Sequence, residues 1–299
     1  MNVLVFGCNG QLGKCLQDLS LEFKSKHGFA FTFLDSKTGD ISNENNVATL
    51  IGSNAIDLVI NAAAYTAVDK AETDIDNAFA VNAQGPEYIA KACTNNNIPF
   101  IHVSTDYVFD GNATQPFTET SATNPNSVYG QSKLTGEQAV IKYLDKHVII
   151  RTSWVFSEYG NNFVKTMLRL ASERDELGIV ADQKGCPTYA GDLALAILNI
   201  AVSIRQGGSN WGAFHYCGEG QTTWYGFANK IFELGLKSGL LKKLPKVNAI
   251  ATIDFPTPAK RPLYSVMDTS KISQQWPVNA CNWQHSLVNV ITKLSAQNN

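Results

Sequence analysis

The sequence predicts an α/β fold, in which a doubly wound parallel sheet is followed by a smaller, mixed C-terminal lobe. Three observations predict it. Continuously apolar runs alternate with helix-like segments through the first half of the 299 residues, as in sheets covered on both faces. A glycine-rich turn lies between the first apolar run and the first helix-like segment. The alternation weakens after about residue 155, so we expect the lobe to come from the second half.

The first half is predicted element by element from its apolar periodicity. The predicted strands are 3–6, 29–34, 57–62, 100–104 and 147–152, and the predicted helices are 10–21, 43–51, 76–95 and 128–144. In the second half, 162–172, 191–204 and 224–236 have helical patterns, and 213–217 is a strand that could rejoin the sheet. Three prolines make 254–262 a loop.

Composition excludes several functional classes. The charged fraction of 17% and the hydrophobic fraction of 44% are ordinary for a soluble globular protein. The net charge of −2 argues against a nucleic-acid partner. No apolar run reaches the roughly 18 residues that span a bilayer, and the first residues lack the features of a signal peptide. The six cysteines form no C-x-x-C pair, which favours reduced thiols in the cytoplasm over a zinc site or disulfides.

The turn after the first strand has the spacing G-x-x-G-x-x-G, formed by Gly7, Gly10 and Gly13. Glycines there let a pyrophosphate approach the backbone and the positive end of the following helix. A glycine pattern alone can be a simple turn, but its place between the first strand and helix predicts dinucleotide binding by a Rossmann-type sheet. We therefore expect a dinucleotide-binding domain over 1–155, rejoined by about 190–217, and a discontinuous substrate-binding lobe over 156–299.

Two further segments bear on the cofactor. Asp35 ends the second strand, where an acid can bind the adenosine ribose and disfavour a 2′-phosphate, whereas Lys37 close by could attract that phosphate. A solvated loop acid is an equal reading of Asp35, so NADH versus NADPH stays open. After the third strand, Ala62, Ala63 and Ala64 are small enough to leave room for a cofactor, or alternatively for helix packing.

The predicted chemistry lies in two segments. Val103, Ser104, Thr105, Asp106 and Tyr107 end the fourth strand, and a helix after Pro125 carries Tyr129 and Lys133. Residues i and i+4 share one helix face, so this pair can point to one site. An ammonium nearby lowers the pKa of a tyrosine, which is otherwise about 10. Such a pair can exchange a proton with a carbonyl oxygen. Alone the spacing is common on helix surfaces, and it gains weight from the glycine turn and the Ser/Thr strand end.

Taken together, these segments resemble the extended short-chain dehydrogenase/reductases, and within them the dTDP-4-dehydrorhamnose reductase family. The matching segments are GCNGQLG (7–13), NAAAYTAVDKAE (61–72), STDYVFDG (104–111), YGQSK (129–133) with Gly136 and Glu137, RTSWVF (151–156), DQKGCPT (182–188) and RPLYSVMDT (261–269). The resemblance implies hydride transfer from NADPH or NADH to the 4-keto group of dTDP-4-dehydro-L-rhamnose, a sugar nucleotide, giving dTDP-L-rhamnose.

The resemblance also implies roles for individual residues. Thr105 would bind the substrate carbonyl, Tyr129 would deliver the proton, and Lys133 would hold the nicotinamide ribose. The residues implied along the cofactor are Gly10, Gln11 and Leu12 at the diphosphate, Asp40 and Ile41 near the adenine, and Ala64, Tyr65, Thr66 and Val103 in the cleft. Trp154 would pack against the sugar.

Several of these residues have alternative readings. Trp154 could be core packing, and Asp106 could be a turn residue or a group that adjusts the proton affinity of its neighbours. Lys260 and Arg261 could be solvated loop charges. Because a nucleotide diphosphate needs cations and arginine suits bidentate phosphate contact, we favour Arg261 as a substrate ligand.

Other functions are weighed on the same residues. Related 4,6-dehydratases have an Asp-Glu pair after the catalytic threonine, whereas Asp106 is followed by Tyr107. A sugar-nucleotide epimerase shares the Tyr and Lys, so it remains an alternative. A second alternative is a nucleotide-binding regulatory subunit that resembles the β subunit of methionine adenosyltransferase. Some relatives form a magnesium-linked homodimer; a homodimer is allowed here, but no acidic cluster marks a metal site, since position 15 is Cys15.

Overall fold

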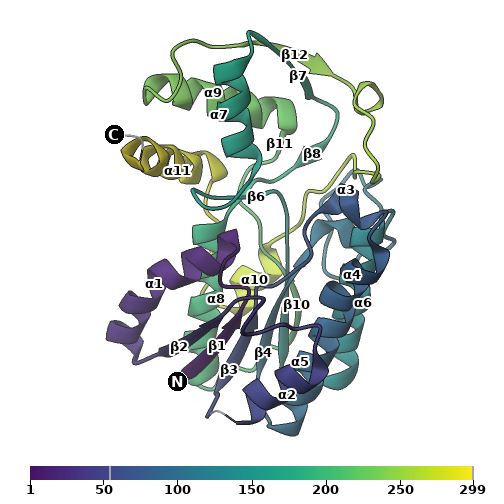
Figure 1. Cartoon of the computed structure of the whole chain (residues 1–299), viewed down its shortest axis with the longest axis vertical. Coiled ribbons are helices and arrows are strands. Elements are labelled where there is room, and N and C mark those ends of the chain that lie inside the picture. Colours follow the sequence, from purple (N-terminus) through teal and green to yellow (C-terminus); the bar gives the residue numbers. More distant parts are fainter. Residues whose placement is uncertain (54, 298–299) are drawn as a thin grey trace.

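The computed structural model describes residues 1–53 and 55–297, and in this part of the chain the central feature is a six-stranded sheet. The strand order is β10-β5-β4-β3-β1-β2, and every neighbouring pair is parallel (Figure 1). The strands are β1 Asn2–Phe6, β2 Ala30–Leu34, β3 Leu58–Asn61, β4 Phe100–Thr105, β5 His147–Thr152 and β10 Gly212–His215. The predicted fold class is confirmed, and the late strand predicted at 213–217 does rejoin the sheet, beside β5.

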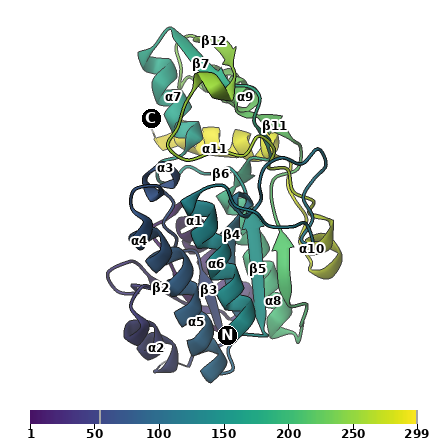
Figure 2. The same cartoon turned by 90° about the vertical axis from the view of Figure 1, so that its right-hand side faces the viewer.

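Helices cover both faces of this sheet (Figure 2). On one face, α1 (Gln11–His27) packs with α8 (Ala190–Arg205) over Val3 and Val5 of β1. On the other, α2 (Glu44–Gly52), α5 (Gly85–Asn95) and α6 (Val128–Tyr143) pack over Leu4 and Phe6. Successive strand residues point to opposite faces, so an unbroken apolar strand serves two cores.

The predicted single helix 76–95 is wrong in its middle. The chain forms α4 (Ile75–Phe79), then a π-helical turn η1 (Ala80–Gln84), and then α5. Pro86 explains why the helix widens into a π-helical turn, because Pro86 has no N–H to donate to the carbonyl of Asn82 four residues earlier. The freed carbonyl lies against Gly136 of α6, where an added Cβ would come within 2.1 Å of it.

The second half forms most of the upper lobe in Figure 1. Helices α7 (Phe163–Glu173), α9 (Trp224–Lys237) and α11 (Trp283–Gln297) enclose its hydrophobic core beside the parallel pair β7 (Glu176–Val180) and β12 (Lys246–Ile250). The sequence patterns missed β7, β12 and α11. Short pairs join β6 (Val155–Phe156) to β9 (Thr188–Tyr189) and β8 (Lys184–Gly185) to β11 (Thr222–Thr223).

The remaining elements are short. They are α3 (Val68–Ala71), η2 (Asp106–Val108), η3 (Thr252–Asp254) and α10 (Ser270–Gln275). The domain limits 1–155 and 156–299 stay a prediction, whose last two positions lie outside the described residues. None of the helices in the described part of the chain combines the length and the apolar character that a membrane crossing requires.

Candidate active site

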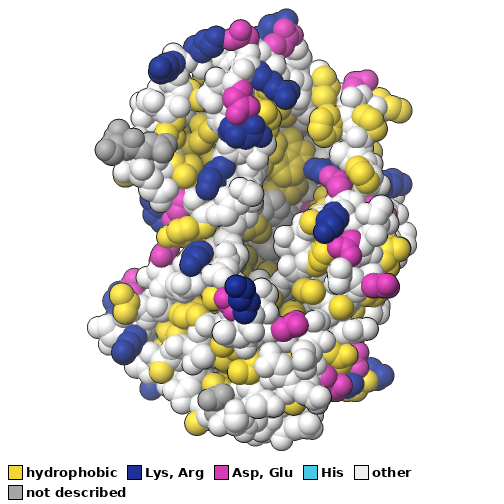
Figure 3. All heavy atoms as spheres, viewed as in Figure 1, with side chains coloured by type: hydrophobic (Ala, Val, Ile, Leu, Met, Phe, Trp, Pro, Cys, Tyr) yellow, Lys and Arg dark blue, Asp and Glu magenta, His cyan; other side chains and the backbone are white. Residues whose placement is uncertain are grey.

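A cleft of about 850 Å³ opens at the carboxyl ends of the sheet strands, below the lobe. Figure 3 shows this hollow with hydrophobic side chains on its upper wall. The predicted site residues that line it are Gly7, Gly10, Gln11, Leu12, Asp35, Asp40, Ile41, Ala62, Ala63, Ala64, Thr66, Val103, Thr105, Asp106, Tyr129, Lys133 and Trp154. Two predicted residues, Gly13 and Arg261, do not line it. The crevice beyond the strand ends is where open α/β sheets bind ligands.

The glycine turn forms one end of the cleft. Gly7 has φ +85°, and a Cβ there would lie 2.4 Å from the backbone nitrogen of Ala63. Gly13 is needed for packing, since its Cβ would lie 2.3 Å from the carbonyl oxygen of Gly7. The turn therefore brings the backbone, rather than side chains, to the N-terminal end of α1, as diphosphate binding requires.

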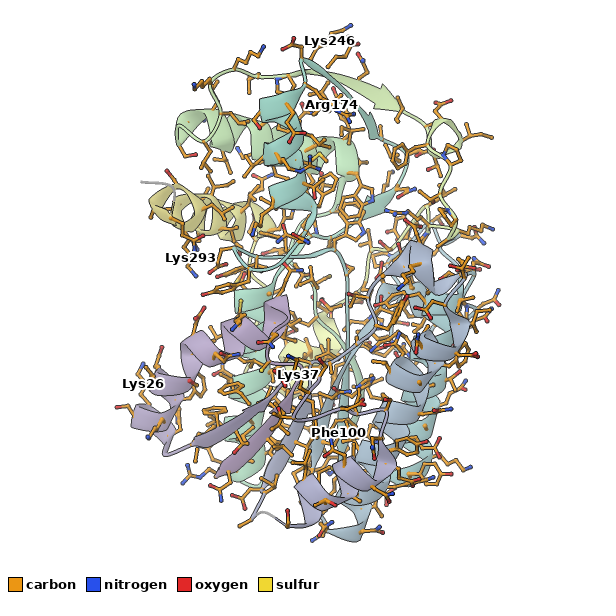
Figure 4. The ribbon with its side chains drawn as sticks, in the orientation of Figure 1. Lys26, Lys37, Phe100, Arg174, Lys246 and Lys293 are labelled. Atoms are coloured by element: carbon orange, nitrogen blue, oxygen red, sulfur yellow. The ribbon has the colours of Figure 1, made fainter. Side chains whose placement is uncertain are left out.

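The loop after β2, where the adenine of the cofactor is predicted to bind, is held by local hydrogen bonds. One oxygen of Asp35 accepts from the backbone N–H groups of Lys37 and Thr38 and from the Thr38 hydroxyl. The Thr38 bonds are the main reason that the pKa of Asp35 is lowered. Figure 4 shows Lys37 over the upper ends of the sheet strands. Asp40 likewise accepts from the backbone and hydroxyl of Ser42.

Tyr129 and Lys133 lie in the first turns of α6 and are both buried. Ser127 starts this helix, since its hydroxyl accepts from the N–H of Gly130. The Lys133 ammonium donates to the carbonyl of Val103 at 2.7 Å, which ties the helix to the end of β4. The Tyr107 ring packs edge-on against that of Tyr129, with centroids 5.4 Å apart.

The expected lowering of the Tyr129 pKa is wrong for this fold. Burial raises the pKa of Tyr129 to about 12, and the adjacent Thr105 hydroxyl lowers it by a smaller amount. Burial also lowers the pKa of Lys133 to about 8, against the opposing charge of Glu137. Burial is the main cause of both pKa shifts, and it disfavours the charged form of each group.

Thr105 and Asp106 form a hydrogen-bonded pair at the end of β4. The Thr105 hydroxyl donates to Asp106 at 2.9 Å and accepts from the N–H of Tyr107. The second bond caps the start of η2. Burial raises the pKa of Asp106 to about 6, against hydrogen bonds from Thr105 and Ser265 that lower it. The charge of Asp106 in turn raises the pKa values of Tyr107 and Tyr129. Asp106 therefore does both things that the sequence left open: it sits in a turn and it adjusts its neighbours.

Asn82, which sequence reasoning missed, joins the segment after β3 to helix α6. Its side chain accepts from the N–H of Tyr65 at 2.8 Å and donates to the carbonyl of Tyr65 and to the hydroxyl of Ser132. It is buried in the π-helical turn. The signal in the sequence was Pro86, which predicts a disturbed helix four residues earlier.

A buried ion pair supports the same helix from below. Arg151 of β5 donates to both carboxylate oxygens of Glu137, at 2.7 to 3.1 Å. Glu137 lies one turn beyond Lys133 on α6, and the Arg151 guanidinium also lies over the ring of Phe109. This pair fixes the angle at which α6 meets the sheet and places a carboxylate near Lys133.

The lobe contributes the upper side of the cleft. Trp154 lines the cleft and also stacks on Trp224, so it is packed in the lobe and still borders the cleft. Arg261 instead donates to Asp69 at 2.9 Å and is about one-third exposed. Asp69 follows Val68, a lining residue, so Arg261 lies next to the rim of the cleft.

Gln11 shows how the two halves of the chain meet at the cofactor turn. Its amide donates to the carbonyl of Val155 and accepts from Ser157 and Asn162. Asn162 and its neighbours Gly160 and Asn161 line the cleft, although no motif marked them. Sequence spacing cannot find contacts between residues so far apart in the chain.

Many dinucleotide-binding folds share the sheet and the glycine turn. Fewer of them also have a Tyr–Lys pair one helical turn apart beside a threonine at a strand end. Together with the large C-terminal lobe, this arrangement defines the class of extended short-chain dehydrogenase/reductases. The chain belongs, within this class, to the family described as the RmlD substrate binding domain, whose model matches residues 1–296. The predicted resemblance is confirmed.

Individual relatives agree with this assignment. The dTDP-4-dehydrorhamnose reductase of Aggregatibacter actinomycetemcomitans is 44% identical over 289 residues, which cover 96% of this chain and 97% of that protein. A dTDP-4-dehydrorhamnose reductase structure from Clostridium acetobutylicum has a TM-score of 0.89 and 39% identity, covering 98% and 99% of the two chains. The structure of the Bacillus anthracis reductase in complex with NADP has a TM-score of 0.88 and 34% identity, with the same coverage.

Proposed function

We propose that this protein reduces the 4-keto group of dTDP-4-dehydro-L-rhamnose to dTDP-L-rhamnose with NADPH or NADH. The observation that carries the proposal is the meeting of Tyr129, Lys133 and Thr105 at one cleft with the glycine turn. The relatives named above carry the same activity in their names, at 34 to 44% identity over nearly the whole chain.

The lining of the cleft fits a nicotinamide dinucleotide. At Gly7 an added Cβ would collide with Ala63, so only backbone lies where the diphosphate would bind. The small side chains of Ala62, Ala63 and Ala64 leave space for the cofactor beside it. Gly10, Gln11 and Leu12 would hold the diphosphate, and Asp35, Asp40 and Ile41 the adenosine end. When bound, the cofactor supplies the hydride.

Tyr129 would donate the proton to the C4 oxygen. Because the pKa of Tyr129 is raised to about 12, its side chain is a phenol at neutral pH, and this is the form that donates. Thr105 would bind the same oxygen, and Asp106 holds the Thr105 hydroxyl in place. Lys133 would bind the nicotinamide ribose and offset the negative charge that develops on Tyr129 after proton transfer.

The lobe would hold the rest of the substrate. Trp154 would pack on the sugar, and Arg261 would leave Asp69 to bind the diphosphate of the nucleotide. Arginine suits this exchange because its planar guanidinium binds carboxylate and phosphate with the same geometry. The lobe residues after 155 would then form the substrate-binding unit, and those before it the cofactor-binding unit.

The test is turnover by the purified protein. With dTDP-4-dehydro-L-rhamnose it should consume NADPH and release a product that NMR identifies as dTDP-L-rhamnose. An epimerase would change the sugar without net consumption of NADPH, and a regulatory subunit would bind nucleotide without turnover. Either result would overturn the proposal.

The same assay decides the preferred cofactor. The Bacillus anthracis relative binds NADP, and Lys37 offers a cation near Asp35. A ratio of kcat/KM above about a hundred, or roughly 2.7 kcal/mol, would show that one cofactor dominates. We also propose a cytoplasmic location, which suits the six cysteines, all of which are free thiols. The homodimer stays a prediction, which light scattering of the purified protein would test.

A further inference from the structure

Trp154 has an unusual backbone for its size. Its φ is +49°, in the left-handed region that bulky side chains rarely adopt. Such a conformation persists only where the surroundings hold it, and it is most frequent at functional sites. Trp154 lines the cleft directly after Thr152 and Ser153, so the unusual backbone turns an indole toward the substrate side of the site.

Trp224 holds this indole from behind. The two rings lie 3.6 Å apart between centroids and only 9° from parallel, so they overlap face to face. Phe163 packs on Trp224 at 4.6 Å, and Phe227 lies beneath them. We call Trp154, Trp224 and Phe163 the aromatic wall. Trp224 does not line the cleft itself, so it acts on the site only through Trp154.

The segment 182–188, which the proposed reaction leaves without a role, fixes the aromatic wall. The buried side chain of Gln183 accepts from the indole N–H of Trp224 at 3.1 Å. Gly185 packs against Trp154, and a Cβ at Gly185 would lie 2.5 Å from the Trp154 ring. The N–H of Thr188 donates to the carbonyl of Trp154 at 3.2 Å.

The same network reaches the loop that carries Arg261. Gln183 donates to the hydroxyl of Thr252, and Thr252 donates to Asp182. Thr252 begins η3, directly before the loop that bonds to Asp69 through Ala259 and Arg261. The indole position and the origin of this loop are therefore set by one amide side chain.

We propose that Trp224 is a positioning residue that makes Trp154 a rigid apolar platform for the sugar of the substrate, with Gln183 and Gly185 fixing the pair. This inference rests on the proposed function, because it takes the sugar of a nucleotide as the group that meets Trp154. A flat aromatic face suits the C–H face of a deoxysugar, whereas the nucleotide would bind elsewhere in the cleft. Trp224 thus contributes to the affinity for the sugar nucleotide, and it does not affect the affinity for the same nucleotide without its sugar.

The test compares Trp224→Ala with Trp224→Phe, using binding of dTDP-L-rhamnose and of dTDP by calorimetry with NADP⁺ present. Trp224→Ala should weaken dTDP-L-rhamnose binding about tenfold and leave dTDP binding within twofold. Trp224→Phe, which keeps a stacking ring, should restore most of the affinity. Stacked indoles should also give an exciton couplet in circular dichroism, which both variants lose. Trp211→Ala, in a tryptophan far from the cleft, is the matched control and should change none of these.

Two results would overturn the inference. One is unchanged dTDP-L-rhamnose binding in Trp224→Ala, and the other is an equal loss for dTDP and dTDP-L-rhamnose, which would indicate a general structural defect. Because binding of the product needs no turnover, the inference is judged separately from the reaction. A wild-type protein that binds dTDP-L-rhamnose more tightly than Trp224→Ala but consumes no NADPH would refute the proposed function alone.

Discussion

The floor of the cleft and its aromatic wall hold their side chains in different ways. On the floor, Tyr129, Lys133 and Asp106 are buried ionisable groups, and each has a shifted pKa and a polar partner. In the aromatic wall, Trp154 and Trp224 are uncharged side chains held by ring stacking, by one hydrogen bond to Gln183 and by the space that Gly185 leaves. In the proposed function, the floor carries out the proton transfer and the aromatic wall shapes the sugar pocket.

The difference teaches how sequence separation relates to role. The floor comes from β4 and the start of α6, which are separated in the chain only by η2 and the loop after it, and which contact each other directly. The aromatic wall comes from residues 154, 163 and 224, and residues 183 and 185 fix it; these segments meet only in the lobe. We expect substitutions on the floor to change kcat, and substitutions in the lobe to change the affinity for the sugar nucleotide.

The largest expected effect is on the floor. Tyr129→Phe removes the proton donor and keeps the ring, so kcat should fall by at least about 10² while cofactor affinity stays within about twofold. Stopped-flow kinetics with a separate NADPH titration would measure both. Near-normal kcat would remove Tyr129 from its role, and Tyr143→Phe at the far end of α6 serves as the control.

The second effect concerns the ion pair beneath the floor. Glu137→Gln leaves Arg151 charged and buried, which should cost about 3 kcal/mol of unfolding free energy. Glu137 raises the pKa of Lys133, so its loss lowers that pKa, and the alkaline limb of kcat/KM, expected near pH 8, should move to lower pH. The double variant Glu137→Gln/Arg151→Gln, which buries no unpaired charge, should recover most of the lost stability. An alkaline limb that does not move in Glu137→Gln would contradict this account.

A third effect is expected at Asn82, which joins the segment after β3 to helix α6. Asn82→Ala removes hydrogen bonds to Tyr65 and Ser132 and leaves their polar groups unsatisfied, so kcat/KM for NADPH should fall about tenfold. Both cofactor affinity and kcat should share the loss, because Asn82 touches both segments. Asn77→Ala, at an exposed position of α4 nearby, should change neither. A loss of thermal stability with normal kinetics would show that Asn82 is structural only.

The smallest effects are expected at the rim of the lobe. Arg261→Met should raise the KM for the sugar nucleotide about fivefold with kcat nearly unchanged, since an arginine that is one-third exposed gives only part of the free energy of a charged hydrogen bond. Asp69→Asn, which weakens the competing ion pair, should change that KM by no more than about twofold. Steady-state kinetics would measure both KM values. If Arg261→Met lowered kcat and left KM unchanged, Arg261 would not be a ligand of the sugar nucleotide.

Apolar periodicity and a few local motifs were enough to predict the sheet, its covering helices and the residues of the floor. Strands β1, β3, β4 and β5 are short apolar runs, and Gly7, Thr105, Tyr129 and Lys133 lie at the ends of elements that the pattern marks. Parallel strands align their carboxyl ends at one edge, so their positions along the chain already placed these residues together.

Tertiary structure alone decided the rest. Gln183 and Trp224 have no local signal for their roles, and Pro86 marks only the disturbed helix at Asn82 and not its partners, because each of the three acts through distant segments. The direction of the Tyr129 pKa shift was also out of reach, since spacing shows a nearby cation but not how deeply the fold buries both groups. The sequence by itself determined which groups can do the chemistry, and packing determined their protonation and the shape of the pocket around them, because burial and stacking are properties of the whole fold.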